Sequence, residues 1–136
     1  MRTISTPDAP APAGHYSQAV VHGGIAYVAG QLPLDPATGD LVGAGDIEAQ
    51  TAQVFRNVEA ILRAAGSRLD LVLSLTVYVT GRSLWGQVNG VCARVFGPHR
   101  PARAVVPVPE LRHGCLIEVQ AVAVAESPAG EARSCV

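Results

Sequence analysis

The chain has 136 residues, of which 49% are apolar and 15% are charged, so it can bury one core without support from disulfides or metal. Its formal net charge of −1 argues against a surface for nucleic acid or anionic membrane, and no apolar run approaches the roughly 20 residues that span a bilayer. All ten basic residues are arginine, and the absence of lysine excludes both Schiff-base chemistry on a protein lysine and the Walker phosphate-binding loop.

The two ends of the chain differ in composition from the middle. Three prolines near the N-terminus argue against regular structure there, and the last ten residues are mostly small and polar. We therefore expect a flexible N-terminal arm over residues 1–13, one domain over residues 14–126 and a flexible C-terminal tail over residues 127–136. The arm lacks the apolar stretch of a signal peptide, which favours a cytoplasmic location.

The first half of the domain contains a predicted hairpin and a predicted helix. Two short apolar runs, residues 18–21 and 25–29, flank Gly23-Gly24, and this pattern is typical of a tight hairpin. Asp46 is a good helix N-cap, and Gly66 is a suitable residue to end that helix. The apolar residues between them recur at a helical period and predict one buried stripe. The polar residues, including Gln50, are expected mostly on the other side.

The second half alternates strands with one more helix. Residues 69–79 predict a strand covered on both faces, and Ser83 is expected to cap a helix that stops at Gly97. Residues 104–108 predict an edge strand because of Pro107, and residues 115–125 predict the last strand. The alternation predicts an α+β domain in which two helices pack on one mixed sheet.

Glu118 and Arg103 are the polar residues that fit this pattern least well. A carboxylate in the most apolar strand is costly unless it has a partner. If the last two strands form a hairpin, residues 105 and 118 pair roughly, and Arg103 lies diagonal to Glu118 on the same face. The pair is then either a structural salt bridge or part of a clamp in which Arg103 binds a substrate carboxylate.

The remaining candidates each have an ordinary structural interpretation as well. Tyr16 could simply pack with its hydroxyl at the surface, and Gly30 could belong to a plain turn or bulge. Asn89 could be an ordinary surface residue of a helix, and Trp85 is expected to be a packing residue.

The cysteine and histidine residues give no sign of a metal site. The three cysteines have no paired spacing, which favours a reducing compartment, and no two of the four histidines share a spacing typical of zinc ligands. Cys92 and Cys115 lie in apolar stretches and are predicted to be buried, whereas Cys135 lies in the tail. We therefore expect no metal.

Five segments in the same order resemble the Rid family, the reactive intermediate deaminases also called the YjgF family. They are HYSQAV at residues 15–20, VAGQLPLDPATG at 28–39, QTAQVFRNV at 50–58, RPAR at 100–103 and IEV at 117–119. The likeness is colinear over about residues 14–126.

The resemblance implies a chorismate-mutase-like fold and a homotrimer with a barrel-like centre, in which the sheets line the middle and the sites lie between subunits. It also implies a cofactor-independent hydrolase of the 2-iminobutanoate/2-iminopropanoate deaminase type. Such an enzyme converts enamine and imine intermediates such as 2-aminoacrylate to a 2-oxo acid and ammonia, which is a form of metabolite damage control. The implied partners are a small imine or enamine carboxylate and further copies of the chain, with no nucleic acid and no membrane.

The family's site residues fall on matching positions of this sequence. Arg103 would hold the substrate carboxylate, and Glu118 would help to orient a water molecule. The main chain at Val105 would contact that water or the amino group. Three further residues match pocket positions, namely Tyr16, Gly30 and Asn89.

Three departures from the family pattern bear on the range of substrates. Ala104 stands where many members carry Ser or Thr, Val105 where some carry Cys, and Gln120 where a second Glu is common. The sequence leaves three functions open: a deaminase of broad scope, a pathway-specific deaminase for an aminomuconate-like compound, and a trimeric module that binds a small molecule without turnover. RNA cleavage is disfavoured by the charge of −1 and the absence of lysine.

Overall fold

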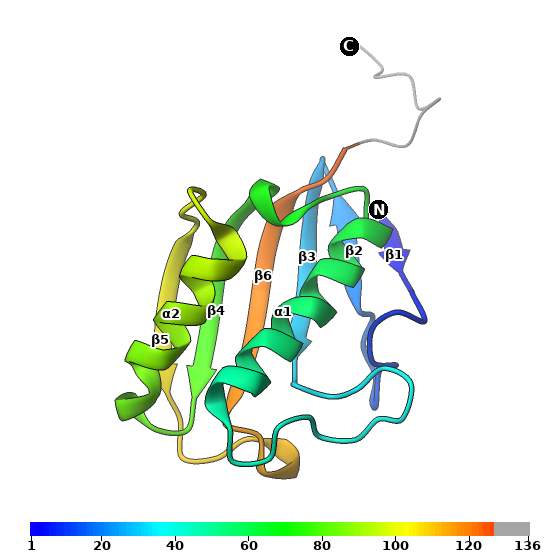
Figure 1. Cartoon of the computed structure of the whole chain (residues 1–136). Helices are drawn as coiled ribbons and strands as arrows, with labels where there is room; N and C mark the ends of the chain where they lie inside the picture. The colour runs from blue at the N-terminus through cyan, green and yellow to red at the C-terminus, as the bar shows by residue number, and fades with distance from the viewer. Residues whose placement is uncertain (127–136) are drawn as a thin grey trace, which may run out of the picture.

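Two helices lie on one face of a six-stranded sheet in the computed structural model, which describes residues 1–126 (Figure 1). The helices are α1 (Ile47–Ala64) and α2 (Trp85–Phe96). The strands are β1 (Arg2–Ile4), β2 (Ala19–His22), β3 (Ile25–Gln31), β4 (Val72–Val79), β5 (Ala102–Pro107) and β6 (Ile117–Val124). This arrangement confirms the predicted α+β class. Residues 127–136, which include the predicted tail and Cys135, lie outside the described part.

The strand order across the sheet is β1-β2-β3-β6-β4-β5. Strands β4 and β5 are parallel, and every other neighbouring pair is antiparallel. A parallel pair needs a long crossover, and α2 provides it between β4 and β5. Strand β5 ends the sheet, as Pro107 predicted. The predicted hairpin of the last two strands is wrong, because β4 lies between β5 and β6.

Helix α1 begins and ends as its sequence predicts. The side chain of Asp46 accepts a hydrogen bond from the amide of Ala49 at 3.1 Å. Gly66 follows the helix with a positive φ of 75°, a conformation that glycine adopts without strain. The predicted apolar stripe of α1 is fully buried against the sheet.

Gln50 corrects the prediction for the polar side of α1, because its side chain is completely buried. Its amide nitrogen donates to the carbonyl of Gly43 at 3.0 Å, and its amide oxygen accepts from the backbone of Leu116 at 2.8 Å. Gln50 therefore ties α1 both to the loop before it and to the segment that enters β6.

The N-terminal residues depart from the predicted arm, because Arg2–Ile4 form β1 and pair with β2. Ile4 and Ala9 are buried in the core. The buried amide of Gln18 donates to the carbonyls of Thr6 and Pro10 and accepts from the amide of Thr6. The prolines in this segment exclude a regular ladder beyond residue 4 but leave the carbonyl groups that Gln18 binds.

Strand and helix starts differ from the predictions where single 3₁₀ turns intervene. Such turns occupy Leu69–Leu71 before β4, Arg82–Leu84 before α2 and Arg112–Gly114 before β6. Helix α2 consequently starts at Trp85 without a side-chain cap, so the prediction of Ser83 as its N-cap is wrong. The helix still ends at Gly97, whose φ is +58°. The predicted turn at Gly23-Gly24 is confirmed, because both glycines have positive φ and join β2 to β3.

The sheet face away from the helices is open in the single chain. The burial of β4 and β6 alternates along each strand, so the prediction that β4 is covered on both faces is wrong for one chain. Four large apolar side chains of the strands are exposed, namely Tyr27, Leu73, Val106 and Val124. Among residues 1–126, no helix has the length and hydropathy needed to cross a bilayer.

Candidate active site

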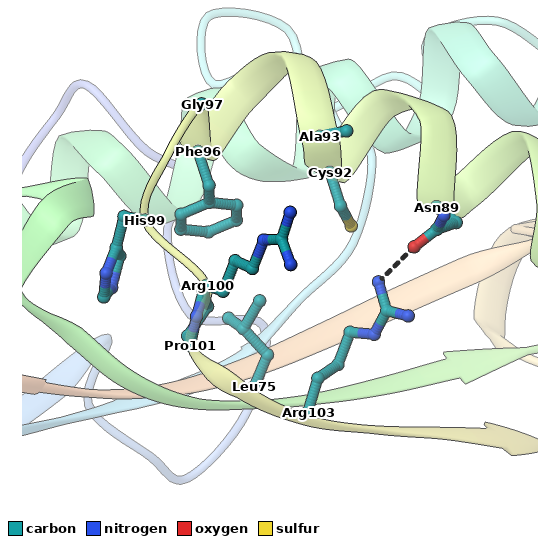
Figure 2. Close-up of a pocket in the computed structure, with 10 residues that line it drawn as sticks. All are labelled: Leu75, Asn89, Cys92, Ala93, Phe96, Gly97, His99, Arg100, Pro101 and Arg103. Atoms are coloured by element: carbon teal, nitrogen blue, oxygen red, sulfur yellow. Dashed lines mark hydrogen bonds between the residues drawn. The ribbon is translucent and has the colours of Figure 1, made fainter.

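Arg103 lies at the start of β5, and its half-buried side chain is held by α2. Its guanidinium donates a hydrogen bond to Oδ1 of Asn89 at 3.0 Å, as Figure 2 shows. The same guanidinium lies 5.6 Å from the ring centroid of Trp85, which is within the range of a cation–π contact. Arg103, predicted as the carboxylate clamp, and Asn89, predicted as a pocket residue, therefore meet across the crossover, and Trp85 adds a contact that its predicted packing role did not include.

The charge of Arg103 has no carboxylate partner in the described part of the chain. The ion pairs between residues 1 and 126 join Arg63 to Glu59 and Arg68 to Asp70 and Glu126. The neighbours of this half-buried guanidinium are a neutral amide, an aromatic ring and the thiol of Cys92, so it keeps donors available. Such a group is suited to bind an anionic ligand through a bidentate, charge-assisted pair.

A hollow of about 550 Å³ opens beside Arg103, between α2 and the segment that enters β5 (Figure 2). Its polar lining residues are Asn89, His99, Arg100 and Arg103. The rest of its wall is largely apolar and comes from Leu75, Cys92, Ala93, Phe96, Gly97 and Pro101. Among residues 1–126, no Asp or Glu lines this hollow, so the charged groups that line it there are cationic.

Cys92 belongs to this hollow, although the sequence suggested only a buried small residue. Its thiol is buried as predicted, and burial raises its pKa while the nearby guanidinium of Arg103 lowers it in part. The spacing of residues along α2 is the feature of the sequence that could have predicted the position of Cys92 in the hollow. Residues 89, 92 and 96 are three and four apart and share one helix face, and this face lines the hollow where Arg103 donates its hydrogen bond to Asn89.

Glu118 and Gly30 form a second cluster on neighbouring strands. A Cβ atom built on Gly30 would collide with the carboxylate of Glu118, so the absence of a side chain at residue 30 lets the carboxylate lie against the β3 backbone. Burial raises the pKa of Glu118, and the charge of Arg112 partly offsets that rise. Gly30 is therefore a site of close approach and not a plain turn.

Tyr16 lies beside this second cluster. Its ring is 50% exposed, and its hydroxyl accepts a hydrogen bond from the amide of Ala13 at 3.2 Å. Tyr16, Gly30 and Arg112 line a shallow depression of about 50 Å³. The structure thus joins three predicted site residues, Tyr16, Gly30 and Glu118, in one region.

The structure does not bring Arg103 and Glu118 together within one chain, which corrects the predicted diagonal pair. Arg103 pairs in register with the buried Leu75 and reaches α2, so it lies on the helix face of the sheet. Glu118 pairs with Tyr78 and alternates with the buried Ile117 and Val119, so it lies on the open face. The two groups project from opposite faces.

Val105 lies on the same face of β5 as Arg103, opposite Val77 of β4. Its side chain packs against the core, as does that of Val77. Strand β5 pairs only with β4 in the described part of the chain, so one side of its backbone has no strand partner. The main chain at Val105 is thus in a strand that can still bind other groups, as the prediction for this residue requires.

The sequence and the fold were compared with known families and solved structures. A family model described as Endoribonuclease L-PSP matches residues 6–125. The chain belongs to the Rid (YjgF) family. A RutC family protein of Pyrococcus horikoshii is 46% identical over 123 residues, which cover 90% of this chain and 97% of that protein.

Solved structures of the family have the same fold. A Rid family protein of unknown function from Yersinia pestis is 41% identical and superposes with a TM-score of 0.88, covering 91% of this chain and 98% of that one. The yjgF gene product of E. coli is 36% identical with a TM-score of 0.87, covering 93% of this chain and 100% of that one. The names of these relatives differ in what they imply about activity, so the activity has to be argued from the site.

Proposed function

We propose that this Rid family member hydrolyses small enamine and imine carboxylates to 2-oxo acids and ammonia without a cofactor. The observation that supports the proposal most strongly is Arg103. Its guanidinium is half-buried, oriented by Asn89 and Trp85, and without a carboxylate partner in residues 1–126. Such a group can bind a substrate carboxylate through two parallel hydrogen bonds.

This hydrolysis requires the protein mainly to position the substrate and a water molecule. An enamine first takes a proton at carbon to become an iminium, and water then adds to the iminium carbon. The carbon–nitrogen bond breaks next, so ammonia leaves and the 2-oxo acid remains. Because an iminium is already electrophilic, a held carboxylate and a placed water suffice. Arg103 would hold the carboxylate, and Glu118 would accept a hydrogen bond from the attacking water.

The burial of Glu118 supports this role. A carboxyl group with a raised pKa is a better proton acceptor than an ordinary glutamate, because its basicity lies closer to neutral pH. The close approach of Gly30 fixes where the carboxylate lies. Tyr16, beside it, would cover the substrate from the exposed side.

Arg103 and Glu118 project from opposite faces of the sheet, so a site that uses both needs two copies of the chain. We propose a homotrimer in which Arg103 of one copy meets Glu118 of the next. The exposed apolar side chains on the open sheet face support an assembly that covers this face. A trimer also accounts for the scarcity of polar residues in β6.

An imine-lifetime assay tests the proposal. An amino-acid oxidase generates 2-iminobutanoate, and semicarbazide traps whatever survives. Wild-type protein should lower the amount of trapped imine. Arg103→Ala should slow the hydrolysis of the imine at least about a hundredfold, because two charge-assisted hydrogen bonds to the substrate are lost. Arg94→Ala, at an exposed arginine of α2 outside the hollow, is the matched control. Full activity of Arg103→Ala would refute the proposed role of Arg103.

Failure of the wild-type protein to consume the imine would favour the binding module. Incubation with RNA under the same conditions tests the activity in the description of the family model. The net charge of −1 and the absence of lysine predict no cleavage.

A further inference from the structure

The hollow beside Arg103 contains a second arginine that the proposed reaction does not use. Arg100 lies just before β5, and its guanidinium points into the hollow toward Cys92 and the side where Arg103 and Asn89 meet (Figure 2). In residues 1–126 it makes no ion pair and no side-chain hydrogen bond. Its donors are therefore free for a ligand.

Stabilisation of the C-terminal end of α2 does not explain where the side chain of Arg100 lies. Cations near a helix C-terminus stabilise the last carbonyl groups, but Arg94 already provides one in the last turn of α2. The chain also turns away from the helix at Gly97, and the amide of residue 99 bonds back to Phe96. The side chain of Arg100 instead extends along the hollow past the ring of Phe96 (Figure 2).

The spacing of the two arginines limits the size of a ligand that could reach both. Arg100 and Arg103 are three residues apart, so their Cα atoms are separated by at most roughly 10 Å. Both side chains extend from the segment that enters β5 toward α2 (Figure 2). Apolar side chains, namely Leu75, Cys92 and Phe96, line the same hollow as the two arginines. The hollow therefore offers two cations beside an apolar wall.

We propose, on the basis of the proposed deaminase function, that Arg100 binds a second carboxylate and that the preferred substrates are imines of short dicarboxylic amino acids. Arg103 binds the carboxylate next to the reacting carbon. The carbon chain lies along the apolar wall, and the far carboxylate pairs with Arg100. A monocarboxylate would leave one cation of the hollow without a partner, whereas a dicarboxylate matches both charges.

A binding experiment tests this subsite without turnover. Titration calorimetry compares 2-oxoglutarate with 2-oxopentanoate, which has the same chain length and one carboxylate fewer. Wild-type protein should bind the dicarboxylate about tenfold to a hundredfold more tightly, the range of a charge-assisted pair. Arg100→Ala should remove the preference, Arg100→Lys should keep part of it, and the control Arg94→Ala should keep all of it.

The turnover of the two corresponding imines, generated from glutamate and norvaline by oxidases, separates the two proposals. If wild-type protein consumes both imines but shows no preference in binding or turnover, the subsite is refuted and the deaminase function stands. If it consumes neither, the function is refuted, and the titration still decides on the subsite. A preference that Arg100→Ala leaves intact would also refute the role of Arg100.

Discussion

Substituting alanine for Gly30 should damage catalysis far more than folding. A Cβ atom at residue 30 would lie 3.1 Å from Cδ of Glu118 and closer still to its Oε1 atom, so the carboxylate must move aside. The backbone of Gly30 is outside the positive-φ region, so alanine adds no backbone strain. The substitution therefore acts almost entirely on the position of Glu118.

The displacement of the Glu118 carboxylate determines how much Gly30→Ala changes the free energy of unfolding and kcat. Moving the flexible end of a glutamate off its preferred rotamer costs roughly 0.5–1.5 kcal/mol. The smaller conformational freedom of alanine in the unfolded chain offsets about 0.4–1 kcal/mol of that cost. The free energy of unfolding should thus change by less than about 1 kcal/mol, whereas misplacing a group that acts on the water by about an ångström can lower kcat by up to about a hundredfold.

Urea unfolding and steady-state kinetics on 2-iminobutanoate measure the two effects. Gly86→Ala is the matched control, because nothing lies within 4 Å of a Cβ at that helical position. It should be fully active and more stable by up to about 1 kcal/mol. The reasoning fails if Gly30→Ala keeps the wild-type kcat. It also fails if Gly30→Ala lowers kcat by the same factor in a Glu118→Ala background as in the wild type.

Three further predictions concern buried polar groups. Gln50→Leu leaves the part-buried amide of Leu116 without its partner, whereas the carbonyl of Gly43 still accepts from the amide of Asp46. The free energy of unfolding should therefore fall by about 1–3 kcal/mol, whereas Gln87→Ala on exposed α2 surface should change it by less than about 0.5; equal urea midpoints for both variants would contradict this. Asn89→Ala removes the hydrogen bond that orients Arg103, so KM for 2-iminobutanoate should rise roughly tenfold with a smaller change in kcat, and an unchanged KM would count against the clamp. Because burial raises the pKa of Glu118 in the folded state, its contribution to stability is complete below its unfolded-state pKa and is lost as the pH rises through the raised value. Glu118→Gln should remove this pH dependence in urea unfolding from acidic to neutral pH, and identical pH profiles would show that the pKa is not raised.

The sequence predicted the local structure well because its signals are local. The cap at Asp46, the stop at Gly66 and the apolar period between them depend on neighbours within a few residues. The order of strands depends on contacts between distant segments, which periodicity does not contain. A hairpin of the last two strands was therefore a reasonable prediction, and it failed because β4 pairs with both of them.

The positions of buried polar side chains are also hard to predict from the sequence, because their partners can lie far away along the chain. Gln50 has the pattern of a surface residue of α1, but its side chain is buried and binds Gly43 and also Leu116, which is 66 residues away. The residue pattern singled out Arg103 and Asn89 separately but did not predict their contact, because they are 14 residues apart and meet only through the β4–α2–β5 crossover. The face on which Glu118 lies required the register of β6, which the sequence does not specify.

A mixing experiment tests most directly the central proposal, an imine-hydrolysing site shared between copies of the chain. Arg103→Ala and Glu118→Ala chains are each expected to be nearly inactive on 2-iminobutanoate. When the two are unfolded together in equal amounts and refolded, random assembly should restore about a quarter of the wild-type activity, because one contact in four joins an intact Arg103 to an intact Glu118. Recovery no greater than the sum of the separately refolded variants would contradict a site built from two copies.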